Sequence, residues 1–284
     1  MVNKENNNKT CLVGMAIFDN YISAFKRWFS IHNEKLNLPV YIITNNVKEF
    51  KNINSDNLNV IDIKDVCDKK ESINKFEKLL YENESIPYKN FTWNIIRYVI
   101  RSAFNDGYKK IIFFENDSVF LMDKTTLIEY VNKIPINHIG CTHQLFSNNH
   151  FAHCYDFYNK NSEYNVPYKK NNKLCSWEGP VFVLKFDDIL YNKFLDAFDK
   201  LTPYTYLLSN QVSKDSGLQV IPHPQNLFCY LFELFDLKLF KWSKIVYPRH
   251  IYKGKPINTY TDNELKNIYD LGGVACIPNE NHYN

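Results

Sequence analysis

Short apolar runs alternate with amphipathic helical patterns along this chain, and that alternation limits it to a small set of folds. Residues 11–17, 40–46 and 57–63 read CLVGMAI, VYIITNN and NLNVIDI, which are typical of buried strands. Apolar side chains at helical spacing follow the first run over 21–32 and the third over 73–81. Alternating strands and helices predict an α/β layer with a mainly parallel central sheet.

Composition narrows the classes of protein that are compatible with this pattern. The 284 residues are 45% hydrophobic, enough to bury a sizeable core, and the net charge is only +3. The chain has no dense run of Lys and Arg, so we expect it to bind neither nucleic acid nor an anionic membrane surface. No apolar segment approaches the ~18 residues of a membrane span, and the N-terminus lacks the apolar core of a signal peptide. Seven cysteines without a C-x-x-C pair favour free thiols in a reducing cytoplasm.

Two carboxylates directly follow a short, strongly apolar run in the middle of the chain. Residues 109–123 read KKIIFFENDSVFLMD, so Glu115, Asn116 and Asp117 directly follow the run 111–114. In open α/β sheets ligands bind beyond the carboxyl ends of the strands, and unpaired carboxylates buried there would cost several kcal/mol. Residues two apart in an extended segment point the same way, so Glu115 and Asp117 can both face one hard divalent cation. The alternative is an ordinary polar turn at the end of a strand.

The segment before this strand has a helical pattern over 92–104. Arg97 and Arg101 lie four residues apart on one face of this predicted helix. Two interpretations of Arg97 are open at this point. It either contacts an anionic ligand or pairs with a neighbouring acid on a solvated helix face.

Residues 144–175 are rich in Asn, Tyr, His and Lys and show no periodicity, which predicts a functional loop or lid. Residue types that bind zinc occur in or beside this segment: Cys141, His143, His150, His153 and Cys154. Their spacing matches no closed structural zinc set, so a zinc site is a secondary hypothesis.

Further elements are predicted in the second half of the chain. They are a strand at 180–186, a helix from Asp187, a second helix at 206–214 and a strand at 218–224. No repeat or linker divides the chain, so we predict a single domain with two abutting halves. We predict a flexible N-terminus at 1–10, a first half at 11–143, and a second half at 144–284 that includes the mobile loop.

Six segments of the chain resemble, in order, the glycogenin and bacterial lipopolysaccharide galactosyltransferase family, glycosyltransferase family 8. KKIIFFENDSVFL resembles its D-x-D strand, and CLVGMAIFDNYISAFKRWFS its first strand and helix. FTWNIIRYVI, SWEGPVFVL, LLSNQVSKDSGLQVIPHPQN and RHIYKGKP are similar to four further motifs. The resemblance implies a GT-A fold, with a Rossmann-like, mainly parallel sheet flanked by helices. It also implies that 11–143 is the nucleotide-sugar-binding half and that 144–284 is the acceptor-binding half, with a C-terminal segment that contacts metal and phosphate.

The resemblance also implies roles for individual side chains. The implied metal ligands are Glu115, Asp117 and His250. The implied donor-binding residues are Phe18, Asp19, Tyr21, Arg97, Asn116 and Lys255. The implied catalytic residues are Gln211, Asn210 and Glu178. Asn210 replaces the usual aspartate of this family, and Glu178 the usual asparagine.

The implied function is Mn²⁺- or Mg²⁺-dependent transfer of a hexose from a UDP-sugar to a glycan or protein hydroxyl. The helix at 209–211 offers no carboxylate base, which together with the family likeness favours retention. Two alternatives use the same fold: a catalytically inactive sugar-nucleotide or glycan-binding module, and an inverting enzyme with Glu178 as base. A nucleotidyltransferase is disfavoured because a glycine-rich phosphate loop is absent after the first strand. Homodimerisation is left open.

Overall fold

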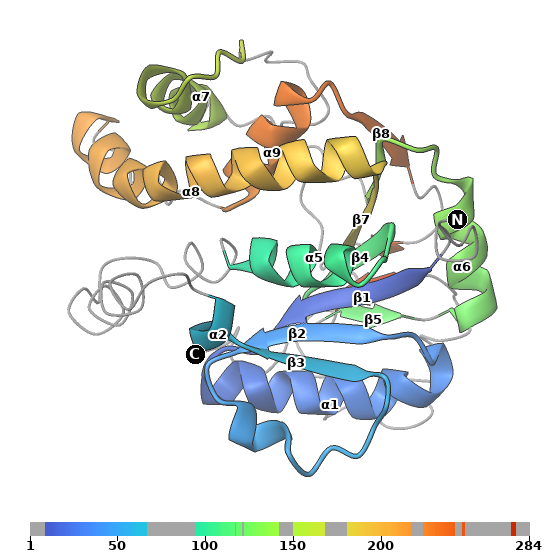
Figure 1. Ribbon diagram of the computed structural model, residues 1–284. Coiled ribbons are helices and arrows are strands. Elements are labelled where there is room, and N and C mark those ends of the chain that lie inside the picture. The colour runs from blue at the N-terminus through green and yellow to red at the C-terminus, as the bar shows by residue number, and fades with distance from the viewer. Residues whose placement is uncertain are drawn as a thin grey trace.

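Two β-sheets organise the part of the chain that the computed structural model describes (Figure 1). The described residues are 9–66, 95–116, 118–120, 122–141, 150–167, 181–216, 224–241, 246–247 and 274–276. The larger sheet has seven strands in the order β3-β2-β1-β4-β7-β6-β8. Its strands are β1 (Thr10–Met15), β2 (Val40–Thr44), β3 (Leu58–Asp62), β4 (Lys110–Phe114), β6 (His138–Cys141), β7 (Val181–Lys185) and β8 (Lys238–Lys241). The smaller sheet, in the order β5-β10-β9, contains β5 (Ser118–Phe120), β9 (Val246–Tyr247) and β10 (Val274–Cys276).

The larger sheet is mixed but mostly parallel, as the sequence predicted. Strands β3, β2, β1 and β4 run parallel to one another, and β7 runs antiparallel to both of its neighbours. In this register Phe114, the last residue of β4, pairs with Val181, the first residue of β7. The chain therefore enters β7 at the edge of the sheet where it leaves β4.

Helices cover both faces of this sheet (Figure 1). One face packs against α5 (Ile96–Asn105), α7 (His150–Asn161), α8 (Asp188–Ser216) and α9 (Pro224–Leu234). The other packs against α1 (Phe18–Leu36) and α6 (Lys124–Lys133). The short helices η2 (Val47–Phe50) and α2 (Ile63–Val66) flank β3. Alternate strand residues face opposite layers, so Phe113 joins the α5 side while Phe114 joins the α1 side.

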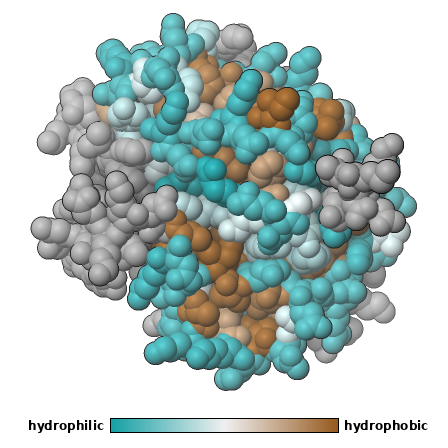
Figure 2. Space-filling view, in the orientation of Figure 1, coloured by the Kyte–Doolittle hydropathy of each residue, from teal (hydrophilic) through white to brown (hydrophobic). Residues whose placement is uncertain are grey.

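The edge strand β3 is less covered than the strands inside the sheet. All five of its residues are partly exposed, and Figure 2 shows hydrophobic colour in the region of this face where Figure 1 draws β2 and β3. Val60 and Ile61 pack toward opposite faces of the sheet. None of the helices within the described ranges is long and apolar enough to cross a bilayer.

Two sequence predictions for the second half of the chain were wrong. The expected structureless segment 144–175 contains α7, whose residues Cys154, Tyr155 and Tyr158 are buried. The two separate helices expected after Asp187 form one continuous helix, α8. Both errors concern helices whose burial depends on aromatic side chains, since Tyr and Phe supply much of the apolar contact area there. Three further elements, α6, β6 and β8, were not predicted from the sequence. The helix expected at 73–81 and most of the strand expected at 218–224 lie outside the described residues.

Glycine is required at position 14 because β1 passes directly over an aromatic ring. A Cβ atom built at Gly14 would lie 2.8 Å from Cζ of Phe114. The ring cannot retreat easily, since it stacks on Trp28 with 3.9 Å between ring centroids. We therefore expect Gly14→Ala to lower the free energy of unfolding by about 1–3 kcal/mol, the usual range for overpacked cores. Urea unfolding at neutral pH measures this loss.

A double-mutant cycle with Phe114→Leu tests the cause of that loss. If the alanine methyl group clashes with the ring, the double variant should be more stable than the sum of the two single effects predicts. Additive effects would show that Gly14 is needed for another reason.

Candidate functional site

The order of the strands places a ligand crevice at the carboxyl ends of β1 and β4. From β1 the chain proceeds outward to β2 and β3, and β4 then returns to the opposite side of β1. A change of direction of this kind leaves a crevice between the two central strands, where ligands of open α/β sheets bind. Val13 pairs with Phe113, so the residues after Met15 and Phe114 border the same opening.

Asn116 joins the two sides of this opening. Its Nδ2 donates to the carbonyl oxygen of Met15 at 2.8 Å and to that of Tyr21 at 3.3 Å. The turn after β4 is thereby held against both the end of β1 and the first part of α1. The side-chain Oδ1 of Asn116 is buried without a hydrogen-bond partner among the described residues, although buried oxygens normally have one. The structure thus gives Asn116 a holding role in addition to the donor contact that the resemblance implies.

Glu115 lies between the buried strand β4 and Asn116 and is partly exposed. Carboxylate and amide oxygens are the hard ligands that Mn²⁺ and Mg²⁺ accept, so the chemistry of this turn fits a divalent cation. Among the residues that the structure describes, no group of three His, Cys, Asp or Glu side chains could hold a metal ion. The other two predicted ligands, Asp117 and His250, fall outside those residues.

Helix α1 begins at the same opening, directly after β1. Its N-cap residue, Ile17, makes no side-chain capping bond, so a side chain at that position does not satisfy the first amides. Phe18 and Asp19 occupy the first turn of this helix, and Tyr21 follows in the next. The backbone position of all three therefore agrees with a place beside the crevice, although the side chains of Phe18 and Asp19 are not among those described.

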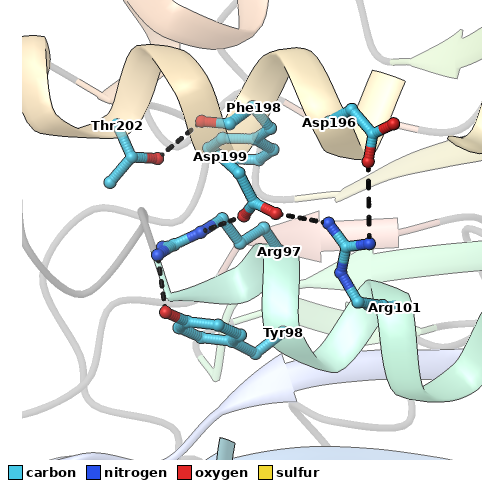
Figure 3. Close-up of polar contacts among 7 residues, drawn as sticks. All are labelled: Arg97, Tyr98, Arg101, Asp196, Phe198, Asp199 and Thr202. Carbon is cyan, nitrogen blue, oxygen red and sulfur yellow. Dashed lines mark hydrogen bonds and ion pairs between the residues drawn. The ribbon is translucent and has the colours of Figure 1, made fainter. Parts of the chain in front are cut away.

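Arg97 lies in the first turn of α5 and bridges to α8 (Figure 3). Its Nε donates to Oδ1 of Asp199 at 2.8 Å, and its Nη2 donates to the hydroxyl of Tyr98 at 2.7 Å. Arg101, one turn further along, donates from Nη2 to the other oxygen of Asp199 at 2.5 Å. The pairing of Arg97 with an acid, one of the two interpretations open from the sequence, is therefore present in the structure. An additional contact of Arg97 with a donor phosphate stays a prediction.

The predicted catalytic residues lie on two different segments. Asn210 and Gln211 belong to the last part of α8, where the backbone is described but the side chains are not. Glu178 and the predicted phosphate ligand Lys255 fall outside the described residues. Glu178 precedes β7 by three positions, and β7 begins beside Phe114. Cys154, one of the residues of the secondary zinc hypothesis, is buried in the core cluster together with residues of α8 and α9.

No protein-family model and no curated protein sequence matches this chain, but solved structures do. The galactosyltransferase LgtC, solved with donor and acceptor sugar analogs, matches with a TM-score of 0.50 and 13% identity over 95% of this chain and 87% of its own. Mouse xyloside xylosyltransferase 1 matches with a TM-score of 0.45 and 12% identity, over 96% of this chain and 98% of its own. The glycosyltransferase GlyE of Streptococcus pneumoniae matches with a TM-score of 0.47 and 12% identity, over 97% of this chain and 57% of its own.

These comparisons first define the class of fold. The mixed, mostly parallel seven-stranded sheet with helices on both faces is the fold of GT-A glycosyltransferases. One protein of that class whose structure this chain resembles is LgtC, at an identity that shows the fold alone.

Proposed function

We propose that this protein is a metal-dependent glycosyltransferase that moves a hexose from a UDP-sugar to a hydroxyl group of a glycan or protein. The observation that carries this proposal is the turn after β4, where Asn116 holds Glu115 at the crevice between β1 and β4. This crevice is the ligand position of the fold class, and the turn supplies hard oxygen ligands there.

The chemistry of the proposed reaction explains why charge would be concentrated at this edge. A UDP leaving group gains negative charge as the sugar–phosphate bond breaks, so groups placed against that charge stabilise the transition state most. A bound Mn²⁺ or Mg²⁺ supplies a Lewis acid for the diphosphate, and Glu115, Asp117 and His250 would hold it. Arg97 and Lys255 would contact the phosphates, while Phe18, Asp19 and Tyr21 would hold the nucleoside.

Retention is the stereochemical outcome that we propose. The end of α8 presents Asn210 and Gln211, neither of which is a carboxylate base. An oxygen of the departing phosphate can take the proton of the acceptor instead, with Gln211 beside the anomeric carbon. The competing proposal, an inverting enzyme, requires Glu178 as the base.

A thermal-shift panel of UDP-, GDP- and CDP-sugars, each with and without Mn²⁺, tests this proposal. A ligand that binds only the folded state raises the melting temperature, so we expect a Mn²⁺-dependent increase with UDP-sugars alone. Mass spectrometry of the same mixtures reports release of sugar. Binding without any release would favour the inactive module, and stabilisation by nucleoside triphosphates instead would favour a nucleotidyltransferase.

The neighbouring arginines of α5 form a matched pair that tests the donor role of Arg97. Both bind Asp199, so Arg97→Met and Arg101→Met each remove a partly exposed ion pair that is worth at most about 1 kcal/mol. Because Arg97 is one turn nearer the start of α5, we expect Arg97→Met alone to weaken UDP binding, by about tenfold for one lost charged contact. Isothermal titration with UDP and Mn²⁺ measures both affinities. Equal affinities in the two variants would assign Arg97 a purely structural role.

A further inference from the structure

The backbone of Phe120 is held by two side chains of α1, far away in the sequence. Nε2 of His32 lies 3.0 Å from the backbone nitrogen of Phe120, and Nζ of Lys35 lies 3.2 Å from its carbonyl oxygen. One residue thus has both of its main-chain polar groups bound by the same helix. We call His32, Lys35 and Phe120 the α1 clamp.

The hydrogen bonds of His32 fix its tautomer. Nδ1 lies 2.8 Å from the carbonyl oxygen of Trp28, and a carbonyl can only accept. Nδ1 therefore carries the proton, and Nε2 presents a lone pair to the N–H of Phe120. The ring is 1% exposed, with Trp28 stacked against it at 4.6 Å and Phe120 edge-on at 5.9 Å between centroids. Both the protonation state and the orientation of the ring are thus determined by its surroundings.

Among the described strands of the small sheet, β5 lies at the edge, and the clamp occupies its outer side. Strand β5 pairs antiparallel with β10, with Phe120 opposite Val274. In antiparallel ladders, alternate residues direct their N–H and C=O groups away from the partner strand. The bonds to His32 and Lys35 show that Phe120 is such a residue, so α1 supplies the partners that a further strand would otherwise provide.

The clamp lies close along the chain to the candidate metal-binding turn. Residues 115–117 separate the end of β4 from the start of β5. On one side of this turn Phe114 is buried in the large sheet and stacked on Trp28. Within the turn Asn116 bonds to Met15 and Tyr21, and beyond it the clamp holds Phe120. The chain is therefore anchored before, within and after the turn, and each anchor involves α1.

From this geometry we infer that His32 and Lys35 are positioning residues, which fix the turn bearing Glu115 in the place where it binds the cation. This inference rests on the proposed function. The two residues act through the backbone of Phe120, as outer partners that hold a metal-binding group in position.

Two clamp variants and two controls on the same helix test the inference. His32→Phe keeps an aromatic ring of similar size but removes the acceptor for the N–H of Phe120. Lys35→Met keeps the apolar stem and removes the donor, whereas Lys35→Arg restores a donor. Lys26→Met is the matched control, because Lys26 pairs with Glu49 of η2 at 2.6 Å on the surface.

Hydrogen exchange and Mn²⁺ titration are measured on each full-length variant. Exchange of the Phe120 amide should become at least about tenfold faster in His32→Phe, because the hydrogen bond that protects it is lost. The dissociation constant for Mn²⁺, titrated with UDP present, should rise about tenfold in His32→Phe and in Lys35→Met, as is common for outer partners of metal ligands. Lys35→Arg and Lys26→Met should bind Mn²⁺ like the wild type. Circular dichroism identifies any variant that fails to fold. If His32→Phe does not fold, the Mn²⁺ affinity of Lys35→Met tests the positioning role by itself.

The outcomes separate this inference from the proposed function. Wild-type Mn²⁺ affinity in a folded Lys35→Met variant would overturn the positioning role. A Phe120 amide that exchanges equally fast in the wild type and in His32→Phe would overturn the clamp itself. If the wild-type protein binds no Mn²⁺ with UDP, the proposed function fails and the role toward the metal fails with it, while the exchange data still decide whether the clamp exists.

Discussion

Replacement of Glu115 by glutamine is expected to reduce sugar transfer by at least about a hundredfold, the usual effect of removing one group that stabilises transition-state charge. The substitution keeps the length of the side chain but removes the negative charge that, under the proposed function, attracts the cation. Asp117→Asn removes the second charge of the same turn, and we expect it to abolish transfer and to weaken UDP binding. Initial rates of UDP release at several Mn²⁺ concentrations measure both effects.

The control for these variants is Glu129→Gln, an identical chemical change on the exposed side of α6. This variant should transfer sugar at the wild-type rate. Circular dichroism of Glu115→Gln establishes that the loss is not due to unfolding. Full activity of folded Glu115→Gln and Asp117→Asn, or of the wild type in excess chelator, would rule out the metal role of this turn.

Acid should destabilise the protein through His32. Burial lowers the pKa of this imidazole from 6.5 to about 4, with a smaller lowering effect from the charge of Lys35. At a pH between these two pKa values, His32 binds a proton in the unfolded chain but not in the folded one. Its contribution to the free energy of unfolding is therefore fully present above pH 6.5 and falls as the pH is lowered. Linkage gives a loss of about 3 kcal/mol between pH 7 and pH 4 from this group alone.

Urea unfolding of the wild type and His32→Phe at pH 7, 5 and 4 isolates this contribution, because other groups that titrate are common to both proteins. The variant is less stable at pH 7, since it leaves the N–H of Phe120 without its acceptor. The difference between the two proteins should shrink by about 3 kcal/mol at pH 4. A difference that does not change with pH would show that His32 is protonated equally in the folded and unfolded states.

The sequence-derived prediction of the site was most informative where the signal was local. The apolar run before Glu115 predicted β4, and the carboxylates after it marked the end of that strand. Asn116 stays a predicted donor-binding residue, and its bonds to Met15 and Tyr21 were not predictable from its position in the sequence. Those partners are 101 and 95 residues away, so no spacing within the local sequence could reveal them.

The same limitation explains why His32 and Lys35 were missed. In the sequence, His32 continues the apolar face of a helix, which is the pattern of an ordinary core residue. Its distinguishing feature is the bond to Phe120, 88 residues further on. The acidic partner of Arg97 was likewise not identifiable from the sequence, because Asp199 lies 102 residues away.

The sequence by itself determined the strands β1 to β4, the helices α1 and α5, and the acidic turn at the end of β4, because periodicity and strand ends are properties of neighbouring residues. Only the tertiary structure decided that β7 runs antiparallel beside β4, that α7 and the first part of α8 pack aromatic side chains into the core, and that α1 binds the backbone beyond the acidic turn. These features depend on contacts between distant segments, whose energies arise only when the chain has folded and excluded water from between them.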